Sequence, residues 1–319
     1  MELRGIIAAV TTPFDGGGNL LPERLDANLG AYNGTGLAGY LVLGSSGEAI
    51  YLDSGEKREV LRRAASAARG SGKLLLAGTG EESLRGTLAM TAAAADYGYA
   101  AAVVRTPHYY KKNMTQAVLA QFYRELAEEA ALPIVLYNIP PLTGVDLGVE
   151  TILELAAHPR IVGLKESSGN MDKVVRITSA MPEFPVLVGG ASTVYPSLCA
   201  GAAGAILALA AAAPGACCAV EEAFKSGDHA RALAAQRALL PACRAFEPYG
   251  IAGLKAAVDA AGLFYGGPPR RPMLALEGAA RAAIQQAMEE IRGKREEGRG
   301  KREEGRGERE KGRGKREKE

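Results

Sequence analysis

The stretch RIVGLKES, residues 160–167, is a short run of apolar and small residues that leads into a lysine. Seven similar runs occur in the first 210 residues: GIIAAVTTP (5–13), GYLVLGSSG (39–47), KLLLAGTG (73–80), AAAVVRTP (100–107), PIVLYNIP (133–140), FPVLVGGAS (184–192) and GAILALA (204–210). Nearly continuous apolar runs are typical of parallel strands whose two faces are both covered. The sequence therefore predicts eight buried parallel strands.

The predicted strands end about every 28 residues, with helical stretches such as TQAVLAQFYRELAEEA (115–130) between them. This alternation predicts an α/β fold, a (β/α)8 TIM barrel over residues 1–213 that carries the catalytic site. A doubly wound open sheet is the alternative. Residues 214–292 show no further strand signal, so we expect them to form a C-terminal helical extension of about three helices.

Residues 293–319 have a different composition from the rest of the chain. They repeat the pattern GKREEGR without any apolar residue and hold 12 Lys and Arg against 8 Glu. Such a segment cannot form a core, so we expect a disordered, low-complexity tail, with a weak polyanion-binding arm as the alternative. The other 292 residues then hold 26 basic and 28 acidic residues, and we expect no nucleic-acid binding by the folded part.

Neither a leader nor a membrane segment is evident. The N-terminal MELRGIIAAVTTPF lacks the basic and apolar regions of a signal peptide, and the longest apolar candidate (198–220) is interrupted by Pro214. We therefore expect a cytoplasmic protein without membrane contact. The four cysteines (199, 217, 218 and 243) show no paired CxxC spacing and the three histidines are scattered, so we expect core thiols and no metal site.

The barrel prediction brings distant residues together. Lys165 follows the sixth apolar run and Tyr137 the fifth, one βα unit earlier, while the turn GSSGE (44–48) follows the second. Side chains at the C-terminal ends of barrel strands share one mouth, where the active sites of such barrels lie. These three segments are therefore expected to meet.

A lysine, a tyrosine and a Gly/Ser turn suit the chemistry of a 2-oxo acid. Desolvation disfavours the charged form of a lysine amine, and a free amine can attack a ketone to form a Schiff base. A phenol can move protons, and a glycine-containing turn can offer hydroxyl and N–H groups to a carboxylate. Taken singly, Lys165 could be an ion-paired residue at the rim, Tyr137 a core aromatic and GSSGE a helix cap.

The combination of motifs resembles the dihydrodipicolinate synthase and N-acetylneuraminate lyase family of class I aldolases. The motifs are GSSGE, TPHYY (106–110), YNIPPLTG (137–144) and GLKESSGN (163–170), and the resemblance covers about residues 5–290. It implies a lyase in which Lys165 forms an imine with pyruvate, so that no cofactor or metal is needed. It also implies a homotetramer.

The resemblance assigns roles to individual residues. Tyr137 would be the acid/base residue, and Ser45 and Ser46 would hold the ketoacid carboxylate. Tyr109 would reach across a subunit boundary to complete a proton relay with Ser45 and Tyr137, and Tyr110 would replace it if the alignment slipped by one residue. The substrate pocket would also include Ser167, Gly189 and Ile206.

The choice of substrate depends on Leu142, five residues after Tyr137, where standard dihydrodipicolinate synthases carry an arginine that binds the aldehyde's carboxylate. Sialic acid lyases carry leucine there, but VGGAS lacks their acidic residues after strand seven. The segment PYGIAGLKAAVDAAGLFYGGPPRRPMLAL (248–276), together with TPHYYKKNM (106–114), most resembles the 4-hydroxy-2-oxoglutarate aldolases, which release pyruvate and glyoxylate. In those enzymes a serine two residues after the lysine helps to bind the substrate, and Ser167 stands at that position. The alternatives are a dihydrodipicolinate synthase that works without the arginine, another 2-oxo acid lyase or dehydratase, and a ketoacid-binding barrel without catalysis.

Overall fold

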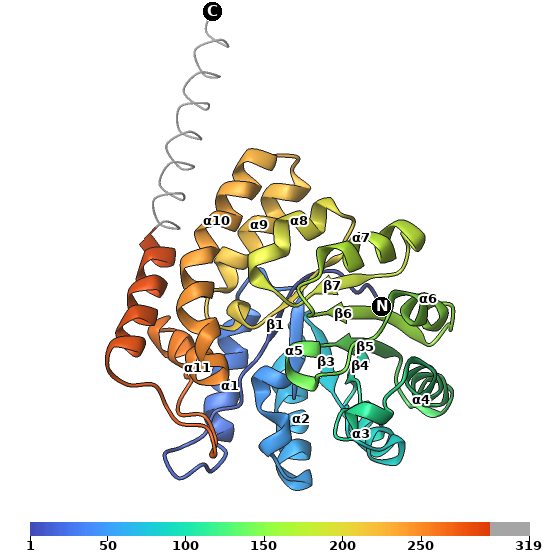
Figure 1. Ribbon diagram of the computed structural model, residues 1–319. Coiled ribbons are helices and arrows are strands. Elements are labelled where there is room, and N and C mark those ends of the chain that lie inside the picture. Colours follow the sequence, from blue (N-terminus) through green and yellow to red (C-terminus); the bar gives the residue numbers. More distant parts are fainter. Residues whose placement is uncertain (294–319) are drawn as a thin grey trace, which may run out of the picture.

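The computed structural model describes residues 1–293, which form a closed barrel of eight parallel strands surrounded by helices (Figure 1). The strands are β1 (Gly5–Ala9), β2 (Gly39–Val42), β3 (Leu74–Gly78), β4 (Ala101–Arg105), β5 (Ile134–Asn138), β6 (Ile161–Glu166), β7 (Val186–Val188) and β8 (Gly204–Leu207). Each lies within one of the eight apolar runs. The predicted (β/α)8 barrel is therefore confirmed, and the open sheet is wrong because β1 pairs with β8.

Helices follow the strands in turn. Those around the barrel are α1 (Pro22–Asn33), α2 (Ser54–Ala68), α3 (Leu84–Asp96), α4 (Gln116–Glu129), α5 (Pro140–Thr143), α6 (Val149–Ala156), α7 (Met171–Ala180), α8 (Val194–Cys199) and α9 (Pro214–Lys225). After these come α10 (His229–Phe246), α11 (Gly250–Ala260) and a helix over residues 278–293.

Strand residues alternate between two cores, which explains the continuous apolar runs. In β1, Ile6 and Ala8 contribute to the core between the strands and the helices. Ile7 faces the barrel interior, where it shares a second cluster with Tyr137 and Ile206. Because both faces of every strand are covered, polar positions on a strand are exceptions that call for an explanation.

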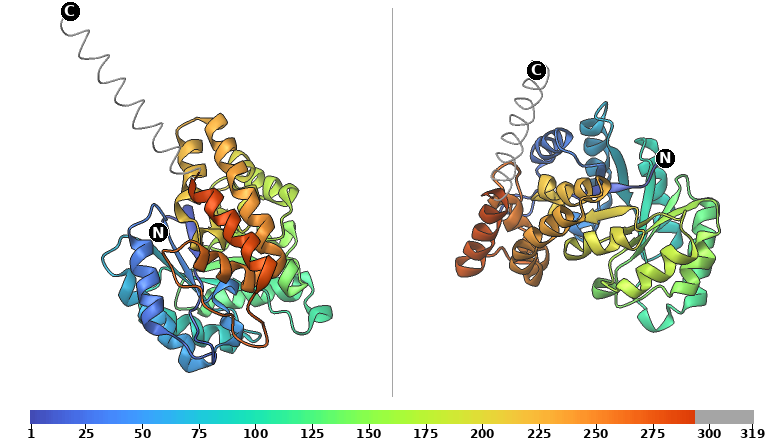
Figure 2. Two further views of the ribbon diagram at one scale, coloured as in Figure 1. Left: turned by 90° about the vertical axis from the view of Figure 1, so that its left-hand side faces the viewer. Right: turned by 90° about the horizontal axis from the view of Figure 1, so that it is seen from above.

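The C-terminal helices α9, α10, α11 and 278–293 gather on one side of the barrel (Figures 1 and 2). Helix α9 contacts β1 and so also covers the barrel, although it belongs to the range 214–292 that we assigned to the extension. No helix of the described residues is long and apolar enough to cross a membrane. The predicted disordered tail lies outside the described residues, except for Gly293.

Candidate active site

Lys165 and Tyr137 lie side by side at the C-terminal mouth of the barrel. They are register partners on β6 and β5, and each is only 4% exposed. The Nζ atom of Lys165 lies 4.1 Å from the centroid of the Tyr137 ring. The structure thus brings together the two residues that the sequence analysis placed in one mouth, and it removes both from bulk water.

The next residue on each strand points away from the interior and makes a buried polar network. The Asn138 amide donates to the Glu166 carboxylate at 2.9 Å, and the N–H of Ser168 donates to the other carboxylate oxygen at 2.6 Å. Buried polar groups that are hydrogen-bonded in this way fix the local backbone. Because neighbours on a strand point to opposite faces, the network orients Tyr137 and Lys165 inwards.

The GSSGE turn meets this pair from β2. The Ser45 hydroxyl lies 3.4 Å from the Tyr137 hydroxyl, and Ser46 is buried beside it in the chain. Leu43, just before the turn, and Glu48, its last residue, have φ angles of 57° and 54°. Such left-handed backbone is uncommon outside glycine and clusters at functional sites. The turn is therefore a specifically shaped segment rather than an ordinary helix cap.

Glu48 anchors the turn to the C-terminal helices. Its carboxylate lies 2.6 Å from the Lys255 Nζ on α11, and both side chains are 1% exposed. It also accepts the Arg270 N–H at 2.8 Å, while Thr12 donates to the Gly47 carbonyl at 2.6 Å. Burial lowers the pKa of Lys255, and Glu48 opposes this shift. The α11 helix thus supports the segment that carries Ser45 and Ser46.

Ser167, Gly189 and Ile206 lie on the neighbouring strand ends. A Cβ atom at Gly189 would come within 1.9 Å of the Ser167 hydroxyl, so the absence of a side chain makes room for this serine. Ile206 is buried in the inner apolar cluster with Tyr137. These positions are consistent with a pocket built from the ends of β6, β7 and β8.

Tyr109 follows β4 but turns outwards. Its side chain is 77% exposed, and its ring packs edge-on against Tyr110, with 5.0 Å between centroids. The Glu82 carboxylate holds this loop, because the N–H groups of His108 and Tyr109 both donate to it at 2.8 Å. Burial alone would raise the pKa of Glu82, but these N–H groups, together with the charges of His108 and Arg105, lower the pKa below its ordinary value. Within one chain, Tyr109 is thus presented to the outside.

Two charged residues near the site were not anticipated from the sequence. Arg105 ends β4 at the barrel mouth, and Lys255 supports the turn through Glu48. The run AAAVVRTP did contain a signal for Arg105, because it is an apolar strand that ends in a cation, as RIVGLKES does. Lys255 gave no such signal, since its partner lies more than two hundred residues away.

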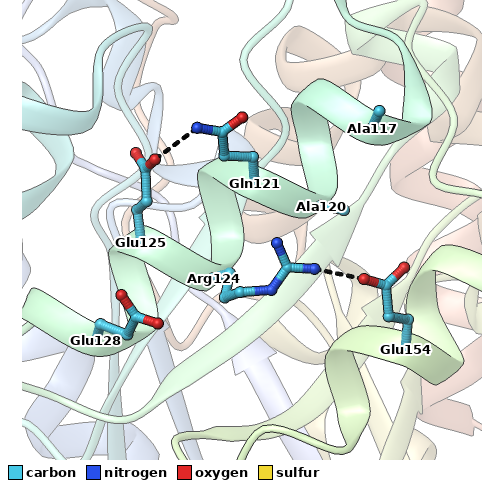
Figure 3. A pocket seen from close by; sticks show the side chains of 7 residues that line it. All are labelled: Ala117, Ala120, Gln121, Arg124, Glu125, Glu128 and Glu154. Carbon is cyan, nitrogen blue, oxygen red and sulfur yellow. Dashed lines mark hydrogen bonds and ion pairs between the residues drawn. The ribbon is translucent and has the colours of Figure 1, made fainter.

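A separate hollow of about 480 Å³ lies on the outer surface of the barrel (Figure 3). Residues of α4 and Glu154 of α6 line it, and ion pairing between Arg124 and Glu154 crosses it. The lining residues are Ala117, Ala120, Gln121, Arg124, Glu125, Glu128 and Glu154. None of the residues at the barrel mouth is among them, so we attach no role in the chemistry to this hollow.

A closed parallel barrel with a buried lysine and tyrosine at its C-terminal mouth defines a class of enzyme, the barrel aldolases and related carbon–carbon lyases. Residues 2–291 match the model of the dihydrodipicolinate synthetase family. The chain belongs to this family and is a lyase.

Curated relatives and solved structures agree with this assignment. The chain is 35% identical over 293 residues to the 4-hydroxy-tetrahydrodipicolinate synthase of Exiguobacterium sp., covering 91% of this chain and 99% of the relative. It is 33% identical over 268 residues to the L-threo-3-deoxy-hexylosonate aldolase of Hypocrea jecorina, covering 80% and 85%. The structure of YagE, a prophage protein of E. coli K12 in complex with pyruvate, superimposes with a TM-score of 0.85 at 27% identity, covering 92% and 99%.

Proposed function

We propose that this enzyme forms an imine between Lys165 and pyruvate and makes or cleaves a carbon–carbon bond to the pyruvate methyl carbon. The observation that carries the proposal is the buried contact of the Lys165 amine with Tyr137, whose hydroxyl lies 3.4 Å from Ser45. No other pair of strand-end residues in the described part of the chain combines a buried amine with a phenol in this way.

The proposed reaction begins when the Lys165 nitrogen attacks the keto carbon of pyruvate and a water molecule leaves. The protonated imine withdraws electrons, so the methyl carbon can lose a proton and become a nucleophilic enamine. This carbon then adds to an aldehyde, and hydrolysis of the imine releases the product; cleavage is the reverse sequence. Tyr137 and Ser45 lie where they can carry the protons of these steps.

The carboxylate of pyruvate is assigned to the GSSGE turn. Ser45 and Ser46 supply hydroxyl groups, and the Ser45 hydroxyl lies 3.4 Å from that of Tyr137, the register partner of Lys165. The imine itself is the electron sink, so the proposal needs no separate cofactor and no metal.

The names of the relatives support 4-hydroxy-tetrahydrodipicolinate synthase, the condensation of pyruvate with aspartate semialdehyde, as the first candidate reaction. The motifs alone favour 4-hydroxy-2-oxoglutarate aldolase, a name that neither of the two relatives described above carries. One observation keeps it as the second candidate. Position 142 on α5, where standard synthases carry the arginine clamp, holds an exposed leucine, so this clamp is absent.

Tyr109 is proposed to act in a neighbouring subunit of a homotetramer. Its exposed ring, next to the exposed ring of Tyr110, provides an aromatic surface at the rim of the barrel. Large exposed aromatic side chains are typical of protein interfaces. A monomeric variant should then lose turnover and keep its fold. Unchanged activity in such a variant would refute the proposal that Tyr109 acts in the site of a neighbouring subunit.

A substrate panel tests the proposal. We expect the enzyme to consume pyruvate with aspartate semialdehyde, or to release pyruvate from 4-hydroxy-2-oxoglutarate, and the faster of the two reactions identifies the substrate. Lys165→Ala should abolish both. Lys225→Ala is the matched control, because the Lys225 side chain is exposed on α9 and its removal should leave activity unchanged. Activity retained by Lys165→Ala would refute the mechanism.

A further inference from the structure

Arg105 is a cation on the inner face of the barrel. It is the last residue of β4, two residues after Val103 and four after Ala101, which both belong to the inner apolar cluster. The intervening Val104 belongs to the outer core. Strand alternation therefore directs Arg105 into the same mouth as Tyr137 and Lys165.

The strand register places Arg105 at the same height along the barrel as Tyr137 and Lys165. It pairs with Tyr137 on β5, and Tyr137 pairs with Lys165 on β6. Neighbouring strands lie about 4.8 Å apart, so the Cα atom of Arg105 is roughly 10 Å from that of Lys165. A molecule of a few carbon atoms that is attached to Lys165 can span this gap.

The contacts of Arg105 leave it available to a ligand. Its guanidinium donates to the Gly80 carbonyl and to the Glu82 carboxylate, the latter at a long 3.4 Å. These two bonds use two of the five N–H donors of an arginine. The side chain is 20% exposed, so it borders the open mouth rather than the core.

We propose that Arg105 binds the carboxylate of the aldehyde that reacts with pyruvate, in place of the arginine that Leu142 replaces. This inference rests on the proposed function and deepens it, because it limits the second substrate to aldehydes that carry a carboxylate. Both candidate partners, aspartate semialdehyde and glyoxylate, meet this condition. A planar guanidinium suits a carboxylate because two parallel N–H groups can bind its two oxygens.

Removing the guanidinium should raise the KM for a carboxylated aldehyde by about 10- to 100-fold, the range expected for a hydrogen bond to a charged group. The KM for pyruvate should not change, because the GSSGE turn holds that carboxylate. A neutral aldehyde should be a poor substrate of both the wild type and the variant.

The experiment compares Arg105→Met and Arg105→Lys with Arg124→Met, a matched control whose guanidinium pairs with Glu154 on the outer surface. Trapping of pyruvate on Lys165 with borohydride is measured first in each protein. Initial rates are then measured with aspartate semialdehyde and glyoxylate, and with the neutral aldehydes butanal and acetaldehyde. We expect intact trapping in all four proteins, a loss only with the charged aldehydes in Arg105→Met, and a smaller loss in Arg105→Lys.

The outcomes separate the two proposals. If the wild type traps no pyruvate, the proposed function fails, and this inference fails with it. If trapping is intact but Arg105→Met uses charged aldehydes as well as the wild type does, only the assignment of Arg105 is overturned. Equal losses with charged and neutral aldehydes would also overturn it, because they would show that Arg105 merely supports Gly80 and Glu82. Arg105→Lys keeps the test valid if Arg105→Met does not fold.

Discussion

Replacing Lys255 with methionine should destabilise the enzyme and loosen its substrate-binding turn. Lys255 and Glu48 form a buried ion pair at 2.6 Å, and Lys255 also donates to the Pro268 carbonyl at 2.9 Å. Methionine has a similar length but cannot donate a hydrogen bond or carry a charge. The variant would therefore leave the Glu48 carboxylate buried without its cation, next to the residues that carry Ser45 and Ser46.

The size of the effect follows from the burial of both partners. Breaking a buried pair by removing one member costs about 3–5 kcal/mol. The unfolding entropy of globular proteins is about 2.1 cal/mol/K per residue, which gives about 0.6 kcal/mol/K for a folded part of 293 residues. The melting temperature should therefore fall by about 5–8 °C. The KM for pyruvate should rise as well, because Glu48 shapes the GSSGE turn.

Differential scanning calorimetry measures the shift, and steady-state kinetics measures the KM. Arg176→Met is the control, because both members of its pair with Glu150 are exposed and its loss should change the melting temperature by about 1 °C or less. If Lys255→Met lowered the melting temperature no more than the control variant does, the idea that α11 anchors the turn through Glu48 would be refuted.

Two further changes test the surroundings of the site. Gly189→Ala should displace the Ser167 hydroxyl, because the new Cβ atom would lie only 1.9 Å from it. The substrate KM should therefore rise several-fold while the protein stays folded. An unchanged KM would exclude a role for Ser167 in substrate binding. Hydrogen bonding from Arg270 lowers the pKa of Glu56 below its ordinary value of about 4.5. This pair therefore stabilises the fold above about pH 4.5, and its contribution is lost as the pH falls through the lowered pKa. Glu56→Gln should therefore show a smaller fall in melting temperature between about pH 5 and pH 3 than the wild type, and an equal fall would contradict the assignment.

Much of the fold could be predicted because buried parallel strands leave a strong local signal. The runs PIVLYNIP and RIVGLKES each contain a strand, and their one-unit spacing correctly predicted that Tyr137 and Lys165 would be adjacent. Local sequence could not predict the pairing of Glu48 with Lys255, because it depends on how α11 packs against the barrel.

Other features depend on geometry that a residue pattern does not encode. The left-handed conformations of Leu43 and Glu48 occur at residue types that give no indication of positive φ. The inward direction of Arg105 becomes clear only when its register with Tyr137 is known. The proposed role of Tyr109 in the site of a neighbouring subunit comes only from the family resemblance. The structure of a single chain contains no residue of a neighbour against which this role could be judged.

The central claim is that the ε-amine of Lys165 becomes covalently bonded to the keto carbon of pyruvate. The most direct measurement is mass spectrometry of peptides from enzyme that has been incubated with pyruvate and reduced with borohydride. We predict one pyruvate-derived adduct per chain, located on the peptide that contains Lys165 and absent from Lys165→Ala. An adduct on another lysine, or unmodified enzyme under conditions in which it turns over pyruvate, would contradict the account.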